Sequence, residues 1–242
     1  MTANSWRTLS AALACLLPLV AGAGQRVNVR VHAEYIALPH ETLTALLQGE
    51  NATDDHALHK KVHALAAKKE ARILETCVVT CLSGERCSLN SIMEFIYPTE
   101  ADFGVFPSQF GTANIRDPGS LPSLPVFPRS SPAAFETRNT GLSFEVEAIV
   151  SEEQDQISLA LSTELVDVLR LVEWQKITDR WGVSGWTFPA FETLEKSGGA
   201  TVAPGRFALL GAFSPRRKGE GGADPKKKNL LFVKATIVAG KK

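Results

Sequence analysis

The sequence has no excess of charge of either sign and no histidine after His63. Lys and Arg together number 26, as do Asp and Glu. This balance lacks the basic excess typical of nucleic-acid-binding proteins, so no nucleic-acid partner is expected. A Gly-x-Ser-x-Gly elbow, a phosphate loop and a His-Glu-x-x-His zinc motif are also missing. We therefore expect neither an enzyme nor a bound cofactor.

Long hydrophobic runs are missing as well, apart from a short one near the N-terminus. Residues 9–20 are apolar, fewer than the about 20 residues that a transmembrane helix needs. Arg7 precedes this run, and the small residues Ala21-Gly22-Ala23 follow it. A charged start, an apolar middle and a small-residue end are typical of a secretory signal peptide. The sequence predicts a signal peptide over 1–23 and an exported mature protein.

Residues 24–70 predict one strand followed by two helices. Apolar residues alternate with polar ones over 27–37, which indicates a strand with one wet face. A helix is expected over 39–48. A second helix, capped by Asp54 or Asp55, should reach about Lys69. These helices are expected to cover one face of a sheet.

Three histidines on the second predicted helix are spaced so that they can share a face. They are His56, His59 and His63, at positions i, i+3 and i+7, an arrangement that helical metal sites use. They are weak candidates for a metal site, because no further ligand is identifiable in the sequence. A solvated helix side is the simpler interpretation.

Two β-rich stretches, 73–82 and 86–96, flank the turn signal Ser83-Gly84-Glu85 and predict a β-hairpin. Pro98 removes a backbone donor, so the second strand should end, or become an edge, at Tyr97.

Three cysteines lie in or beside this predicted hairpin. Cys77 and Cys81 are about 13 Å apart along one strand, too far for a disulfide. Cys81 and Cys87 would face each other across the hairpin, and export places them in an oxidising compartment. Either Cys81 and Cys87 form a disulfide or all three remain buried free thiols.

The second half of the chain combines two loops with further strands. Prolines and glycines recur over 103–134 and predict a long Pro-rich loop. Alternation over 142–150 and 157–161 predicts a second hairpin. Residues 214–228 are basic and glycine-rich, and a flexible loop is expected there.

Large aromatic residues gather in one region, where Gly182 and Gly185 favour a loop. The residues concerned are Trp174, Trp181, Trp186 and Phe188. Tryptophan is common at protein contacts and membrane interfaces, so these residues are candidates for a partner or membrane contact. The alternative is that they belong to a core.

Several segments between 70 and 238, taken in order, resemble the C-terminal β-domain of secretins, the outer-membrane channels of type II and III secretion and of type IV pili. The segments are the Tyr97-Pro98 strand exit, the glycine-led strand Gly141-Leu142-Ser143-Phe144, and the strands expected at 188–193, 201–211 and 229–238. The resemblance implies an α+β, mostly β fold, in which the segment 24–70 packs with an antiparallel β-sheet domain of long hairpins over 71–242. It also implies partners in the secretion or pilus machinery, self-association into a homo-oligomer, and a place in the periplasm or outer membrane.

The sequence departs from the secretin pattern near its end. Residues 214–228 replace a Val-Pro-x-Leu-Gly-x-Ile-Pro segment, and Ala212 follows Gly211 where a second glycine is expected. These departures favour an exported structural or accessory subunit of a bacterial envelope secretion or type IV pilus system, acting by protein–protein assembly. The alternative is a soluble periplasmic or surface ligand-binding module that uses the Trp-rich loop.

Overall fold

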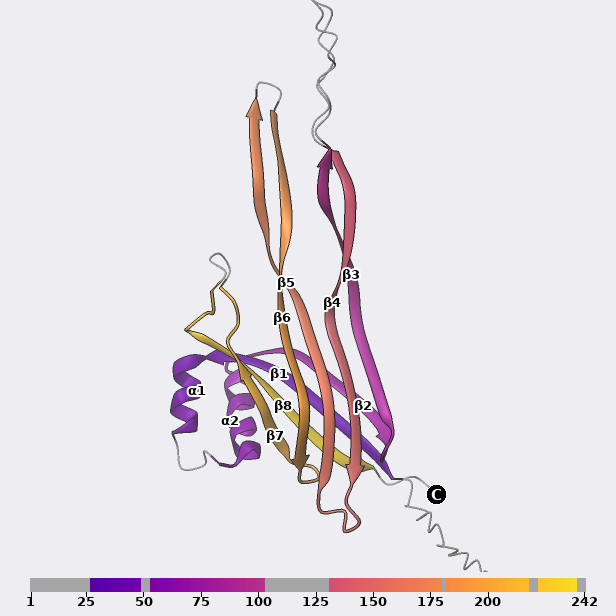
Figure 1. The fold of residues 1–242 in the computed structure, drawn as a ribbon. Coiled ribbons are helices and arrows are strands. Elements are labelled where there is room, and N and C mark those ends of the chain that lie inside the picture. The colour runs from indigo at the N-terminus through magenta and orange to yellow at the C-terminus, as the bar shows by residue number, and fades with distance from the viewer. Residues whose placement is uncertain (1–26, 49–52, 103–130, 180–181, 218–221, 239–242) are drawn as a thin grey trace, which may run out of the picture.

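The computed structural model describes residues 27–48, 53–102, 131–179, 182–217 and 222–238. Strands dominate these ranges, and the α+β, mostly β fold class is confirmed. The elements in chain order are β1 Asn28–Pro39, α1 His40–Leu47, α2 Asp55–Ala67, β2 Arg72–Leu82, β3 Arg86–Asp102, β4 Ser131–Val150, β5 Ile157–Asp179, β6 Gly182–Val202, β7 Phe207–Phe213 and β8 Lys227–Val238 (Figure 1). Neither helix in these ranges has the length and apolar character needed to cross a membrane.

The strands form two antiparallel four-stranded sheets. Sheet A has the order β2-β1-β8-β7, and sheet B has the order β3-β4-β5-β6. One face of sheet A packs on sheet B, and the alternating apolar residues of both sheets meet in one core. Val31 of β1, Val146 of β4 and Leu231 of β8 are fully buried there. Because β1 pairs with both β2 and β8, the segment 24–70 and the segment 71–242 share one sheet.

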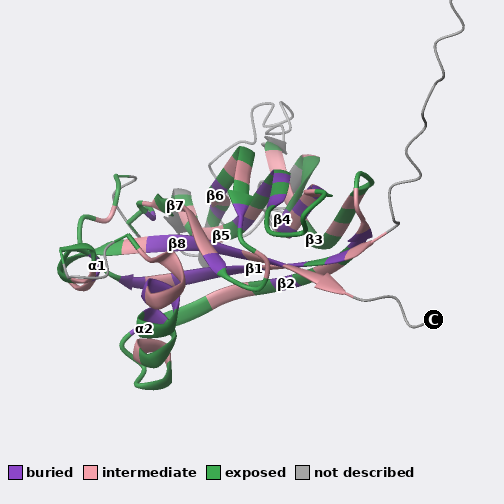
Figure 2. Cartoon of the chain, turned by 90° about the horizontal axis from the view of Figure 1, so that it is seen from below, coloured by how far each residue is buried: buried purple, intermediate pink, exposed green. Residues whose placement is uncertain are grey.

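The two helices cover the opposite face of sheet A at one end. Leu58 and Val62 of α2 and Leu43 of α1 pack there against Ile36 of β1 and Phe232 of β8 in a second apolar cluster. Figure 2 shows the resulting order of helices, sheet A and sheet B. Both helices lie where the sequence predicts them, α1 beginning after Pro39 and α2 after the capping side chain of Asp54.

The predicted hairpin of 73–82 and 86–96 is wrong in its pairing, although both strands exist. Residues 83–85 form a turn that carries the chain from sheet A to sheet B, so β2 pairs with β1 and β3 pairs with β4. Cys81 is therefore opposite Val29, and Cys87 is opposite Val146. Beyond Pro98, β3 continues to Asp102 as an edge strand, with irregular register at the proline.

Two expected loops are shorter than predicted within the described residues. Residues 103–130 of the expected Pro-rich loop over 103–134 lie outside the described residues, and residues 131–134 already belong to β4. The expected flexible loop over 214–228 contains a short bridge between Arg216 and Ala223 and gives its last residues to β8. Both differences arise because β4 and β8 begin earlier than their apolar alternation indicates.

The predicted second hairpin is confirmed as β4 and β5, and both strands continue far beyond it. The pairing of β4 with β5 runs from Gly141, which is opposite Val166, to Val150, which is opposite Ile157. Before Gly141 in the chain, β4 pairs with β3 alone, and after Val166, β5 pairs with β6 alone. The result is two separate long hairpins that extend past sheet A (Figure 1).

Candidate functional site

The point where the two hairpins separate is built around Gly141. This residue has φ of +108°, and a Cβ placed on it would lie 2.2 Å from the backbone oxygen of Ser91. Only glycine permits so close an approach of β4 to β3 with this backbone conformation. Gly141 is also the first residue of β4, in chain order, that pairs with β5. The fork in sheet B therefore begins at a position that needs glycine.

Above the fork, each hairpin twists so that β3 faces β6. The Phe191 ring of β6 lies 6.0 Å from the Phe95 ring and 5.6 Å from the Tyr97 ring, both of β3. Arg138 of β4 is placed over the same Phe191 ring at 5.0 Å and donates a hydrogen bond of 3.1 Å to Thr193. These contacts join the two hairpins by side chains where the backbones no longer pair.

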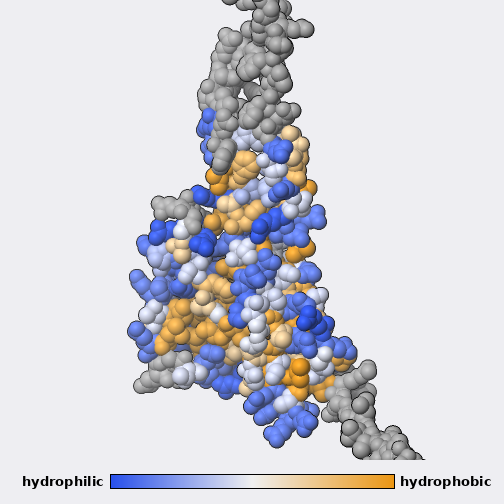
Figure 3. Space-filling model, viewed as in Figure 1, coloured by the Kyte–Doolittle hydropathy of each residue, from blue (hydrophilic) through white to orange (hydrophobic). Residues whose placement is uncertain are grey.

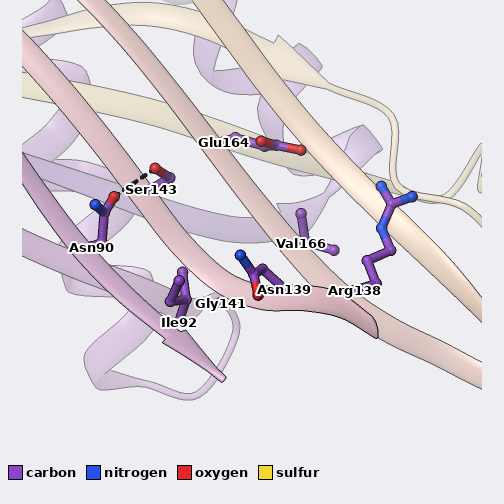
Figure 4. Close-up of a pocket in the computed structure, with 8 residues that line it drawn as sticks. All are labelled: Asn90, Ile92, Arg138, Asn139, Gly141, Ser143, Glu164 and Val166. Atoms are coloured by element: carbon purple, nitrogen blue, oxygen red, sulfur yellow. Dashed lines mark hydrogen bonds between the residues drawn. The ribbon is translucent and has the colours of Figure 1, made fainter. Parts of the chain in front are cut away.

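A cavity of about 370 Å³ lies at the fork, with a mainly polar lining (Figure 4). Ser143 donates a hydrogen bond of 2.7 Å to Asn90 on one side, and Glu164 and Arg138 line other parts of it. These residues come from β3, β4 and β5. The cavity lining offers both hydrogen-bond donors and hydrogen-bond acceptors, but it includes no histidine and no cysteine.

The hairpins carry large apolar side chains that remain exposed in the single chain. Met93 and Ile96 of β3 are each 64% exposed, and Phe135 of β4 and Leu171 of β5 are each 59% exposed. Figure 3 shows apolar surface among polar groups along this part of the molecule. Large exposed apolar surface on a protein often marks a contact site.

Both edges of sheet B are open within the described residues. Strand β3 pairs only with β4, and strand β6 pairs only with β5. Below the fork, the β6 edge includes Ser197, Gly198 and Gly199, and Nζ of Lys196 donates a hydrogen bond of 2.7 Å to the Ser197 carbonyl. An edge strand presents a row of unpaired backbone N–H and C=O groups, so this edge is suited to pairing with another strand.

The aromatic residues expected in a loop lie on strands instead. Trp174 belongs to β5, Trp186 and Phe188 belong to β6, and Trp186 is opposite Gln175 in the β5–β6 register. Trp186 is buried and Phe188 half-buried, and neither lines the cavity at the fork. Trp181 lies outside the described residues. The loop interpretation is wrong because Gly182 and Gly185 are on an edge strand, where glycine is tolerated.

The three described cysteines are free thiols. Cys77 and Cys81 are buried between the sheets, and burial raises the pKa of each thiol to about 11. Cys87 packs against the same core and lies close enough to Cys81 to form a side-chain hydrogen bond. The turn between β2 and β3 thus keeps Cys81 and Cys87 adjacent even though their strands are not paired, and a bridge between them stays a prediction.

The structure gathers histidines around the carboxylate of Glu34, in the middle of β1. The Nε2 atoms of His59 and His63 lie 2.9 Å and 3.4 Å from its Oε2 atom, and Nε2 of His32 lies 3.0 Å from its Oε1 atom. Glu34 is buried, with 5% of its surface exposed, so the polar face of β1 is not wet at this point. The reason is that α2 covers it.

The structure brings only two of the three predicted histidines together. His59 and His63 meet at Glu34, but Nδ1 of His56 accepts a hydrogen bond of 3.3 Å from the backbone N–H of Phe207. Residues Glu34, His59 and His63 have ligand atoms within 4.8 Å of one another, a spacing at which they could hold a metal ion. Glu34 was missed because its partners lie on an element 25 residues away. The sequence did contain one indication of Glu34 as a partner, because this acidic residue lies on a predicted strand that the helices were expected to cover.

No family model and no curated protein matches the chain. Similar solved structures include the type III secretion injectisome secretin InvG of Salmonella, at 11% identity and a TM-score of 0.44, covering 90% of this chain and 66% of that one. Others are ExeD of Aeromonas hydrophila, at 13% identity and 0.40, covering 88% and 49%, and the type IV competence pilus secretin PilQ of V. cholerae, at 10% identity and 0.41, covering 89% and 62%. The chain spans less than two thirds of each of these solved chains.

Proposed function

We propose that this chain is an exported structural or accessory subunit that assembles side by side with further copies through the edges of sheet B. The observation that carries the proposal is the pair of open edges, β3 and β6, on a sheet whose long hairpins expose large apolar side chains. Edge strands bind by adding main-chain hydrogen bonds to a neighbouring sheet. The role is assembly and not catalysis.

Pairing of β3 in one copy with β6 in the next repeats the same contact around an assembly. The two edges differ in sequence, so the contact is heterologous, and such contacts generate either closed rings or open filaments. Above the fork, the two edges already contact each other within one chain through the rings of Phe95 on β3 and Phe191 on β6. The lower parts, with Ser88 on β3 and Ser197 on β6, remain available to neighbours.

The machine that this assembly serves is proposed from the sequence resemblance to secretins. The signal peptide expected over 1–23 exports the chain, and its partners belong to an envelope secretion or type IV pilus system in the periplasm or outer membrane. The exposed apolar side chains, such as Met93 and Leu171, become covered by neighbouring copies, by a partner protein or by the outer membrane.

Light scattering on the chain extracted from envelopes, with and without mild detergent, tests the assembly. A ring-sized or filamentous particle is expected. A monomer under both conditions contradicts self-assembly and favours the alternative, a soluble ligand-binding module. In that case, we would replace Trp181 and Trp186 with alanine and measure the change in fluorescence on addition of ligand. An unchanged response would show that these residues are not part of the ligand site.

Cross-linking locates the contact. Ser88→Cys and Ser197→Cys, combined in a Cys87→Ser background, place one thiol on each open edge. A short bis-maleimide reagent cannot join them within one chain, because three strand spacings, about 14 Å, separate them. A ladder of multimers is expected from the double variant, and no ladder from either single variant, because the contact joins unlike edges.

A matched control moves one thiol from an edge to a central strand. Ser158 of β5 is also exposed but has strands on both sides. Ser88→Cys with Ser158→Cys should give no ladder. A ladder of equal strength from this control would show contact through the face of sheet B, and would overturn the edge-to-edge arrangement.

A further inference from the structure

We propose that Glu34, His59 and His63 form a binding site for a transition-metal ion, Zn²⁺ being the best fit, between α2 and sheet A. The three residues offer one carboxylate oxygen and two imidazole nitrogens within 4.8 Å of one another. Two histidines and one carboxylate with a position left for water form a donor set known from zinc sites. This site is independent of the assembly surface on sheet B.

The backbone brings the ligands together with little freedom. His59 and His63 are four residues apart on α2, so they lie one above the other on the same helix face. Their ring centroids are 5.0 Å apart. Glu34 faces them from β1, where α2 is anchored on sheet A by Leu58 and Val62. A rigid helix on a rigid sheet therefore fixes the positions of all three ligands.

The distances suit a small ion. In a tetrahedral site with metal–ligand bonds of about 2.0–2.1 Å, ligand atoms lie about 3.4 Å apart. Oε2 of Glu34 is 3.4 Å from Nε2 of His63 and 2.9 Å from Nε2 of His59. A widening of a few tenths of an ångström between Glu34 and His59 brings both pairs to this spacing.

The surroundings favour an ion over an isolated carboxylate. A buried carboxylate such as Glu34 needs compensation of its charge. Nε2 of His32 is buried and lies 3.0 Å from Oε1 of Glu34, but at an angle that makes no hydrogen bond. A third imidazole nitrogen is therefore at hand, next to the other carboxylate oxygen of Glu34.

Aromatic rings and one cation complete the shell. Phe207 stacks on His59 with ring centroids 3.6 Å apart, and Phe232 meets His59 edge-on at 5.1 Å, which holds this imidazole in place. Lys234, whose charge acts on His32, lies 4.6 Å from the centroid of the Phe207 ring. Its charge opposes a bound cation, but the lysine side chain is held on the ring and is not among the ligands.

The ion can enter from solvent on the His63 side. The His63 side chain is 45% exposed and lines a surface hollow of about 590 Å³ next to Ala66 and Arg72. The ligand set chooses the ion, since imidazole suits Zn²⁺, Ni²⁺ and Cu²⁺, whereas Mg²⁺ prefers oxygen ligands. An open ligand position towards the hollow leaves room for water or an exogenous anion.

Calorimetric titration of the metal-stripped full chain with ZnCl₂ tests the site. We expect one Zn²⁺ per chain, no binding of Mg²⁺, and a higher melting temperature with Zn²⁺, since an ion bound to the native state stabilises it. His63→Ala should weaken Zn²⁺ binding at least tenfold. Because His63 is half-exposed, this variant should fold, which circular dichroism can verify.

His56→Ala is the matched control. It removes an imidazole from the same helix, but one that is bonded to Phe207 and is absent from the ligand set, so the Zn²⁺ affinity should change less than twofold. Glu34→Gln should weaken binding and abolish the visible absorbance of tetrahedral Co²⁺ in the site. No saturable Zn²⁺ binding, or equal losses in His56→Ala and His63→Ala, would overturn the proposal and leave the cluster as an ion-pair network that docks α2.

Discussion

The hydroxyl of Tyr35 on β1 lies 3.1 Å from the hydroxyl of Thr163 on β5, and both residues are 1% exposed. This contact crosses from sheet A to sheet B inside an otherwise apolar core. Each hydroxyl is satisfied by the other, and burial raises the pKa of Tyr35. A polar pair that has its partners fixed in this way specifies how the two sheets stack.

Removing both hydroxyls of this pair should cost less than the sum of the two single removals. Tyr35→Phe leaves Thr163 buried without its partner, and we expect the free energy of unfolding to fall by about 1–3 kcal/mol. Thr163→Val should have a similar effect. The double variant should lose clearly less than the sum, because no orphaned hydroxyl remains. Urea unfolding of the four proteins measures the coupling, and additive losses would show that the two hydroxyls are satisfied independently.

The strands and helices follow from local patterns, and for this reason they were predictable. Alternation around Val31 and Val146 and the Asp54 cap of α2 are properties of neighbouring residues, and the structure confirms them. Pairing is not local. The short turn at Ser83–Glu85 suits a hairpin, but the same turn also carries a chain from one sheet to the next, and the burial of Cys77 and Cys81 is compatible with both arrangements.

The histidine cluster shows the same limit. Spacing along α2 indicates that His59 and His63 share a face, but it favours His56 equally. The discriminating partner, Glu34, comes from β1, and only the packing of α2 on sheet A turns a polar strand face into a buried site. The open edges of sheet B were also beyond the sequence, because edge position depends on the order of strands.

Gly141→Ala should destabilise the fork strongly. A methyl group there meets the carbonyl oxygen of Ser91, and the positive φ adds backbone strain, so we expect a loss of at least about 2 kcal/mol in the free energy of unfolding. Gly205→Ala is the control. Gly205 also has a positive φ, +77°, but its Cβ would meet no atom within 4 Å, and about 1–2 kcal/mol is expected. Equal losses would show that crowding by β3 contributes nothing.

The cysteines should differ in their reaction with iodoacetamide. Cys77 and Cys81 are buried thiols whose pKa burial raises to about 11, so little thiolate is present at pH 8 and both should stay unmodified until urea unfolds the chain. Cys87 is half-buried and should react first in the reduced protein. Peptide mass mapping reads the order of modification. Early modification of Cys77 would contradict the burial of this residue between the sheets.

The same mapping after mild oxidation tests the predicted bridge. If Cys81 and Cys87 form a disulfide, their peptides should appear linked, and Cys77 should remain a free thiol. Cys87→Ser is the control, because it removes the neighbouring thiol and should leave Cys81 unlinked. Linked peptides that contain Cys77 would show a different pairing, and unlinked peptides throughout would leave three free thiols.

Asp54 joins the start of α2 to the turn before β7, and its role depends on pH. Its Oδ1 atom accepts hydrogen bonds from the backbone N–H groups of His56 and Ala57 and from Arg206, the last at 2.8 Å. The hydrogen bond from Arg206 is the largest cause that lowers the pKa of Asp54. A carboxylate with a lowered pKa in the folded state stabilises the fold above its unfolded pKa of about 3.9, and this contribution disappears as the pH falls through the folded value.

Two substitutions separate the cap from the charge. Asp54→Asn keeps a side-chain oxygen that can cap α2 but loses the charge that faces Arg206, whereas Asp54→Ala loses both. We expect melting temperatures at pH 7 in the order wild type, Asp54→Asn, Asp54→Ala. At a pH below the folded pKa, wild type and Asp54→Asn should become alike, because the carboxyl is then neutral, while Asp54→Ala stays lower. If the gap between wild type and Asp54→Asn persists at low pH, the ion pair with Arg206 is not its cause.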